Sequence, residues 1–373
     1  MARATVTIAA LAVLVSLTWT AEALPRIQAL NSLRDAFSTH VELIDADELV
    51  LPEPTQYKNP KPLIGILSQA CHYCPGKSYV AAAYVKWIES AGGRAVPIRY
   101  YESEDEIHRL FRSVNGVILP GGLTDLWLDD PYVLAAKKLI QWATEENEAG
   151  EVFPVWGTCL GHQLQMILTA NVDFNDLLIT TDAVAHPSTL NFYGESNYSR
   201  LFKEMNPELK AKLSDKRYNI AMENHEFGVA PEAFTKWIVL NDTYDILSTS
   251  TDRNGAEYIS TIEHIKYPFF GTQWHPEKPP YEFSLDNIPH SRDAVHVSQH
   301  LADVFVDYAR HSSHKPESKE EELAMLIYNY EAYFTARDIV MEPSYDGPDI
   351  TYFFDPQEDV DLRQPGVKMG VLA

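Results

Sequence analysis

The stretch VFPVWGTCLGHQLQMIL, residues 152–168, sets the fold class of this chain of 373 residues. Residues 152–156 form a short apolar run typical of a buried strand, and residues 164–168 belong to an apolar helix. Between them, Gly157-Thr158-Cys159-Leu160-Gly161 has to turn a strand sharply into a helix. Glycines on both sides of such a turn avoid side-chain collisions. A buried strand that leads directly into a helix is typical of an α/β protein.

Strands and helices alternate on both sides of this stretch. Strands are predicted at 62–68, 95–98, 116–119, 152–156, 257–262 and 269–274. Helices are predicted over 79–91, 102–112, 133–143, 164–168 and 293–310. The region 172–250 shows no regular pattern. Alternating strands and helices predict an α/β fold with a mainly parallel central sheet and helices on both faces.

Cys159 has the setting of a nucleophile. Gly-x-Cys-x-Gly is the cysteine form of the Gly-x-Ser-x-Gly nucleophile elbow. We expect the thiol at a helix N-terminus, where the helix dipole and free N–H groups favour the thiolate. A lone cysteine is more often a buried core residue. The flanking glycines and the strand–helix context favour the nucleophile.

Two further motifs also lie at strand ends, where active sites of parallel sheets gather. His275, in His275-Pro276-Glu277, is expected to take the thiol proton and later protonate a leaving amine, with Glu277 holding the imidazole. Pro120-Gly121-Gly122 follows another strand, and the backbone N–H groups of Gly122 and Leu160 are expected to form an oxyanion hole. Taken alone, a single histidine is more often structural, and Pro-Gly-Gly is a plain turn.

Charge and cysteine content exclude several classes of function. The chain has 30 Lys and Arg against 53 Asp and Glu, a formal net charge of −23. This balance disfavours nucleic-acid binding and a polybasic membrane-surface role. Three cysteines are too few for a disulfide scaffold. Cys71 and Cys74 have no second ligand pair at zinc-site spacing, so no metal is expected, and a local disulfide or two free thiols remain open.

The N-terminus resembles a secretory signal. Residues 1–23 combine a short basic start, an apolar run and a small-x-small cleavage site, although an uncleaved anchor is the alternative. Asn197 and Asn241 begin glycosylation sequons, which fit that route. We therefore predict a lysosomal or extracellular protein with no membrane segment after cleavage.

The remaining chain is divided by composition. Residues 24–60 are interpreted as an N-terminal lead-in and 61–335 as the catalytic domain. Residues 336–373 are interpreted as an acidic C-terminal extension, mobile at its end.

At these motifs the sequence resembles the class I glutamine amidotransferase superfamily, and more narrowly the γ-glutamyl hydrolases. The resemblance rests on residues 156–161 and 273–278, and for the narrower group on 62–67, 79–86, 89–92, 115–122 and 279–283. It implies a flavodoxin-like fold, a cysteine-type omega peptidase with Cys159 and His275 in catalysis, and folate polyglutamates as substrates. It further implies His225 as a secondary active-site histidine, and a homodimer. No cofactor is implied.

One departure leaves alternatives open. Gly161-His162-Gln163 resembles the ammonia-producing glutaminases, whereas the hydrolases usually have Phe-Glu after the glycine. A glutaminase or another γ-glutamyl amidase is therefore one alternative, and a catalytically silent secreted binding protein is another. The net charge of −23 would repel a polyanionic substrate at long range, so we expect a local basic site that the sequence does not locate.

Overall fold

The structure is a computed structural model that describes residues 57–70, 78–194, 196, 198–336 and 347–355. All described residues belong to one compact unit. The predicted signal, most of the lead-in, Cys71, Cys74 and Asn197 lie outside the described residues. Within the described part, no helix is both long and apolar enough to cross a membrane.

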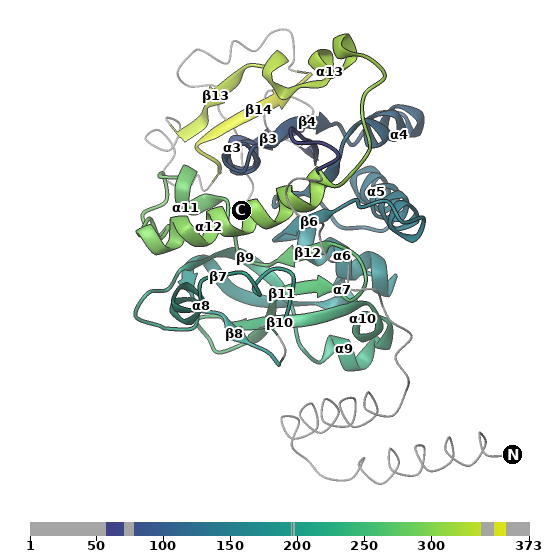
Figure 1. The fold of residues 1–373 in the computed structure, drawn as a ribbon. Coiled ribbons are helices and arrows are strands. Elements are labelled where there is room, and N and C mark those ends of the chain that lie inside the picture. The colour runs from purple at the N-terminus through teal and green to yellow at the C-terminus, as the bar shows by residue number, and fades with distance from the viewer. Residues whose placement is uncertain (1–56, 71–77, 195, 197, 337–346, 356–373) are drawn as a thin grey trace, which may run out of the picture. The chain divides into compact units, whose positions relative to one another are not determined.

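A sheet of eight strands forms the centre, in the order β4-β1-β5-β6-β12-β11-β10-β8 (Figure 1). Five neighbouring strands are parallel: β4 (Arg94–Ile98), β1 (Leu63–Leu67), β5 (Gly116–Leu119), β6 (Val155–Thr158) and β12 (Phe269–Thr272). Three antiparallel strands complete it: β11 (Glu257–His264), β10 (Tyr244–Thr251) and β8 (Asn191–Phe192). The parallel strands are almost entirely buried, as their apolar runs predicted. The α/β fold with a mainly parallel sheet is confirmed.

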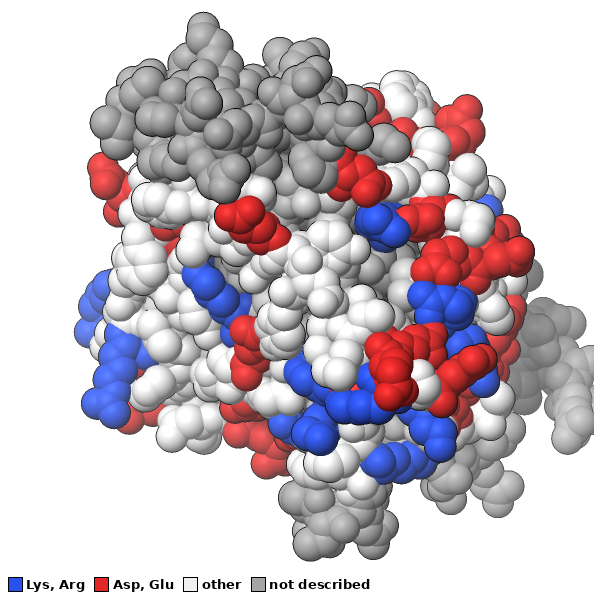
Figure 2. Space-filling view, turned by 90° about the horizontal axis from the view of Figure 1, so that it is seen from above, with Lys and Arg blue, Asp and Glu red and all other residues white. Residues whose placement is uncertain are grey.

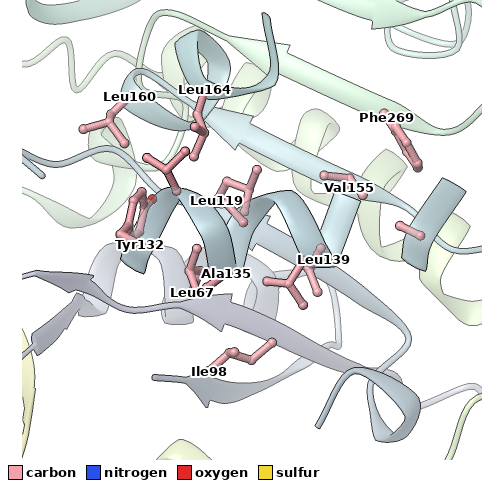
Figure 3. Close-up of a cluster of buried hydrophobic side chains, with 14 of the residues drawn as sticks. Leu67, Ile98, Leu119, Tyr132, Ala135, Leu139, Val155, Leu160, Leu164 and Phe269 are labelled. Carbon is pink, nitrogen blue, oxygen red and sulfur yellow. The ribbon is translucent and has the colours of Figure 1, made fainter. Parts of the chain in front are cut away.

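Helices cover both faces of this sheet. They are α3 (Ala82–Ser90), α4 (Glu104–Ser113), α5 (Pro131–Glu148), α6 (Leu160–Ala170) and α12 (Arg292–Arg310). Neighbouring residues of β6 point to opposite faces. The Trp156 ring therefore packs against Trp87 of α3, with centroids 4.9 Å apart, and against Phe305 of α12. Val155 faces the other way, into the apolar cluster with Leu139 of α5 and Leu164 of α6 (Figure 3).

A second sheet joins the two ends of the described chain. Its order is β13 (Ala332–Phe334), β14 (Ile350–Phe354), β3 (Ser78–Ala81) and β2 (Gln69–Ala70). Tyr79 pairs with Phe353, so the helix expected from residue 79 begins only at Ala82. The expected domain boundary at residue 335 is also wrong. Since β14 lies between β13 and β3, the folded domain continues to residue 354.

The region without a sequence pattern contains a second antiparallel pair, β7 (Leu178–Ser188) and β9 (Ala221–Val229). β7 is mostly half-buried or exposed, which explains why it shows no apolar run. The remaining short elements are α7 (Phe174–Leu177), α8 (Pro207–Leu213), α9 (Ala233–Lys236), α10 (Ile238–Thr243), α11 (Lys278–Tyr281), α13 (Lys319–Met325) and the 3₁₀ turn Ile327–Asn329.

Candidate active site

Cys159 lies at the turn between β6 and α6 with an unusual backbone. Its φ is +51° and its ψ −107°, a conformation that costs a residue with a side chain on the order of 1–3 kcal/mol. The Cys159 N–H donates to Thr272 O of β12 at 2.7 Å, which anchors the turn to the neighbouring strand. The expected sharp strand-to-helix turn is therefore present, with the cysteine at its apex.

The two flanking glycines are required by close backbone approaches. A Cβ at residue 157 would lie 2.6 Å from Gly161 O, and a Cβ at residue 161 would lie 1.9 Å from Leu119 O at the end of β5. Any side chain at either position would push α6 away from the sheet. The spacing Gly-x-Cys-x-Gly thus reflects how closely this helix approaches two strands.

The expectation of a stabilised thiolate at Cys159 is not met. Burial raises the pKa of the thiol to about 12, and the carboxylates of Glu277 and Glu223 act in the same direction. A hydrogen bond from the Leu160 N–H to the sulfur and the charge of Lys278 oppose this rise only in part. The thiol instead faces the Asn224 carbonyl, with 3.8 Å between Sγ and O. The Cys159 thiol is therefore neutral at rest.

His275 and Glu277 form a buried hydrogen-bonded pair. Nδ1 of His275 lies 2.6 Å from Oε1 of Glu277, while Nε2 of His275 has no hydrogen-bond partner among the described residues. Burial lowers the pKa of His275 despite the nearby Glu277 carboxylate. Burial alone would raise the pKa of Glu277, but the charge and hydrogen bond of His275 hold it below its usual value. The pair is thus a neutral imidazole beside an ionised carboxylate.

Gly121 brings the turn after β5 to the same place. A Cβ at this residue would lie 2.8 Å from Cε1 of His275 and 3.2 Å from Cβ of Cys159, so these two atoms are within about 6 Å of each other. At Gly122, a Cβ would collide with the Gln69 side chain at 2.4 Å. Gly121 thus keeps the space between Cys159 and His275 free of a side chain, while Gly122 leaves room for the Gln69 side chain. The oxyanion role of the Gly122 and Leu160 N–H groups remains a prediction.

Tyr84 of α3 is a site residue that the sequence analysis did not single out. Its buried hydroxyl accepts a hydrogen bond from the Gly121 N–H at 2.8 Å. Burial, followed by the charge of Glu277, raises its pKa well above the usual range. The hydroxyl therefore stays neutral and holds the glycine turn in place. Its only sequence signal was its position within the resembling stretch 79–86.

His225 of β9 is buried near the thiol, but both of its ring nitrogens have protein partners. Nδ1 lies 2.9 Å from Oγ1 of Thr181, and Nε2 lies 3.1 Å from Oε2 of Glu223. Neither nitrogen is available to a substrate in this arrangement. β9 also supplies the Asn224 carbonyl that faces the Cys159 thiol.

His162 and Gln163 stand where the hydrolases usually have Phe-Glu, and both side chains point away from the thiol. Nε2 of His162 lies 3.3 Å from the Ile259 carbonyl, inside the core. The Gln163 side-chain amide donates to Phe227 O at 2.7 Å and to Oε1 of Gln273 at 3.2 Å. These contacts join α6 to β9 and to the residues just before His275. The two residues therefore brace the site.

One predicted feature lies away from the site. Asn241 is exposed on α10, where its predicted glycosylation remains a prediction. Among the residues that the structure describes, no group of three or more His, Cys, Asp or Glu side chains could hold a metal ion.

Comparison with known proteins identifies one matching family model and several relatives that share the name γ-glutamyl hydrolase. The family model for peptidase C26 matches residues 62–277. The chain is 39% identical to γ-glutamyl hydrolase of Bos taurus, over 81% of this chain and 95% of that protein. It is 39% identical to γ-glutamyl hydrolase 2 of Arabidopsis thaliana, over 75% and 81%. It is 35% identical to γ-glutamyl hydrolase B of Dictyostelium discoideum, over 77% and 83%.

Proposed function

The chain belongs to the peptidase C26 family, and on this premise we propose that it is an enzyme that hydrolyses γ-glutamyl amide bonds, with Cys159 as nucleophile. The observation that carries the mechanism is the strained turn that presents the Cys159 thiol beside His275, whose Nε2 is unpartnered. The names of the relatives support the bond that is cleaved, and the family resemblance extends the substrate proposal to folate polyglutamates.

The first half of the reaction starts from a neutral thiol and a neutral imidazole. Cys159 Sγ attacks the γ-carbonyl carbon while its proton passes to Nε2 of His275. The N–H groups of Leu160 and Gly122 stabilise the oxygen of the tetrahedral intermediate. The intermediate collapses when the C–N bond breaks, and the amine leaves with the proton that His275 had taken. A γ-glutamyl thioester on Cys159 remains.

The second half uses the same groups with water. His275 takes a proton from a water molecule, which attacks the thioester carbonyl. The C–S bond then breaks, the product carboxylic acid is released, and the proton returns to the Cys159 sulfur. Each half passes through an imidazolium, and the buried Glu277 carboxylate at 2.6 Å stabilises that positive charge.

The burial of the site explains why the proton transfer accompanies the attack. With the thiol pKa raised and the His275 pKa lowered, a standing thiolate–imidazolium pair is disfavoured in the free enzyme. The charge separation becomes favourable only when the substrate carbonyl is polarised by the oxyanion donors. Catalysis therefore depends on their geometry more than on an activated thiol.

The experiment is hydrolysis of a pteroylpolyglutamate of defined length by the purified protein, with products separated by chromatography and identified by mass spectrometry. Release of glutamate or γ-glutamyl peptides is expected, and the product lengths distinguish internal from terminal cleavage. Free glutamine as a second substrate separates a hydrolase from a glutaminase. An active Cys159→Ala variant would rule out the mechanism.

A further inference from the structure

A γ-glutamyl group brings a negative charge into an acidic site. Its α-carboxylate lies only a few bonds from the γ-carbonyl that Cys159 attacks. Glu277 and Glu223 both act electrostatically on that thiol, so the protein needs a compensating cation close by. The sequence alone did not locate one.

Lys278 is a buried cation directly beside the proposed catalytic pair. It follows Glu277 and is the first residue of α11, which lies against α3 and α12 (Figure 1). Only 9% of the residue is exposed. Its backbone is fixed at both ends, because its N–H donates to His275 O and its carbonyl accepts from the Glu282 N–H at 2.9 Å. Its ammonium group has no hydrogen bond or ion pair with any of the residues that the structure describes.

The charge of Lys278 acts on three ionisable groups of the site. It acts to lower the pKa of the Cys159 thiol and of Glu277, and it contributes to the lowered pKa of His275. It also opposes burial at Glu282, whose pKa is nevertheless raised to about 7. The Lys278 ammonium is therefore within electrostatic reach of the atom to which the acyl group becomes attached.

Several exposed cations of the molecule, unlike Lys278, have acidic partners. On the face shown in Figure 2, many Lys and Arg side chains lie beside Asp or Glu side chains. Arg109 pairs with Glu106 at 2.7 Å and Lys138 with Glu104 at 2.8 Å. A cation on a mostly buried side chain gains free energy when an anion joins it.

We propose that the Lys278 ammonium binds the α-carboxylate of the γ-glutamyl group whose γ-carbonyl is attacked by Cys159. This inference rests on the proposed function and adds the residue that selects γ-glutamyl compounds over other amides. A lysine suits this task because it presents a compact charge with three donors to a single carboxylate. The substrate then supplies the partner that Lys278 lacks in the protein.

A purely structural role is the competing explanation. In that case Lys278 serves only to offset the buried carboxylates of Glu277 and Glu282. Such a role would affect stability and general activity, but it would not depend on whether the substrate carries an α-carboxylate. The test therefore compares two substrates that differ only in this group.

The experiment measures kcat/KM for γ-glutamyl p-nitroanilide and for its α-carboxamide analogue, using the full chain. The p-nitroanilide leaving group has no carboxylate, so the comparison reports on the acyl side alone. We expect the wild type to prefer the carboxylate by about 10- to 100-fold, as for a charge-assisted hydrogen bond. In Lys278→Met this preference falls to near one, mainly through KM, and in Lys278→Arg much of it remains.

Lys266→Met is the matched control, because Lys266 is an exposed lysine between β11 and β12. It should keep the wild-type preference. Lys278→Gln provides a second neutral variant, and thermal unfolding verifies that each variant is folded. A wild type that hydrolyses both substrates equally well overturns the inference, as does an unchanged preference in Lys278→Met or Lys278→Gln. A wild type that hydrolyses no γ-glutamyl compound refutes the proposed function instead.

Discussion

Replacing Gly161 with alanine tests whether the approach of α6 to β5 sets the position of Cys159, the proposed nucleophile. The added Cβ would lie 1.9 Å from the Leu119 carbonyl oxygen and 2.6 Å from its carbonyl carbon. Both are backbone atoms of a buried strand, so neither can rotate away. Since real Cβ atoms essentially never come within 3.0 Å of another heavy atom, α6 has to move by about 1 Å.

Two opposing effects determine the consequence of this shift. Alanine favours a helix over glycine by about 1 kcal/mol, whereas overpacking costs about 1–3 kcal/mol. The net loss of stability is therefore small, about 0–2 kcal/mol. Activity should suffer much more, because Cys159 and the Leu160 N–H move with the helix. A misplacement of about 1 Å can lower the rate about 100-fold.

The measurements are kcat for a γ-glutamyl p-nitroanilide and urea unfolding, with Gly150→Ala as the matched control. Gly150 has a φ of +87°, and a Cβ there would meet no atom within 4 Å. That variant should lose about 1 kcal/mol through backbone strain and keep its kcat. The reasoning fails if Gly161→Ala retains kcat within about threefold of the wild type.

Three more outcomes follow from the charges of the site. Glu277→Gln keeps the shape of the side chain but removes the charge that stabilises the imidazolium. We therefore expect kcat to fall about 100- to 10,000-fold with little change in KM. A decrease of kcat by less than about threefold would contradict this role. Alkylation of Cys159 by iodoacetamide should be slower than that of free cysteine, because burial raises the thiol pKa to about 12. Its rate should keep rising as the pH increases above 9. Rapid inactivation already at pH 5, at a rate that does not change with pH, would reveal a thiolate instead. His162 has a folded pKa lowered by burial to about 3, so below pH 6.5 the unfolded chain binds the extra proton and stability is lost as the pH falls towards 3. Each pH unit in that range lowers the free energy of unfolding by about 1.4 kcal/mol. In urea unfolding, the stability of His162→Gln should therefore fall less than that of the wild type between pH 6.5 and 4.5. Equal slopes of stability against pH for the variant and the wild type would refute the assignment.

The sequence was most informative where structure is local. The apolar run before Gly157 predicted β6, and the two glycines around Cys159 predicted the turn, because both depend on neighbouring residues. The pairing of Tyr79 with Phe353 joins strands that are far apart in the sequence, so the helical pattern around Val80 concealed a strand. β7 is also stabilised by its partner β9, and its own sequence shows no alternation.

The protonation state of the thiol could not be predicted in the same way. The position of Cys159 at a helix N-terminus favours a thiolate, and that part of the reasoning was local. Burial and the approach of Glu223 from β9 outweigh it, and both arise only when the chain is folded. The role of Tyr84 could not be predicted either, because its contact with Gly121 joins α3 to the turn after β5 and forms only when the chain is folded.

The position of β14 has a consequence for when the enzyme is completed during synthesis. β14 lies inside the second sheet, and the Asp349 carboxylate just before it accepts the N–H groups of Phe283 and Ser284, which follow α11. A chain still on the ribosome can already contain the turn at Cys159, but it lacks the strand that ties α3 and α11 together. We therefore expect a nascent chain to acquire hydrolytic activity only after residue 354 has left the exit tunnel.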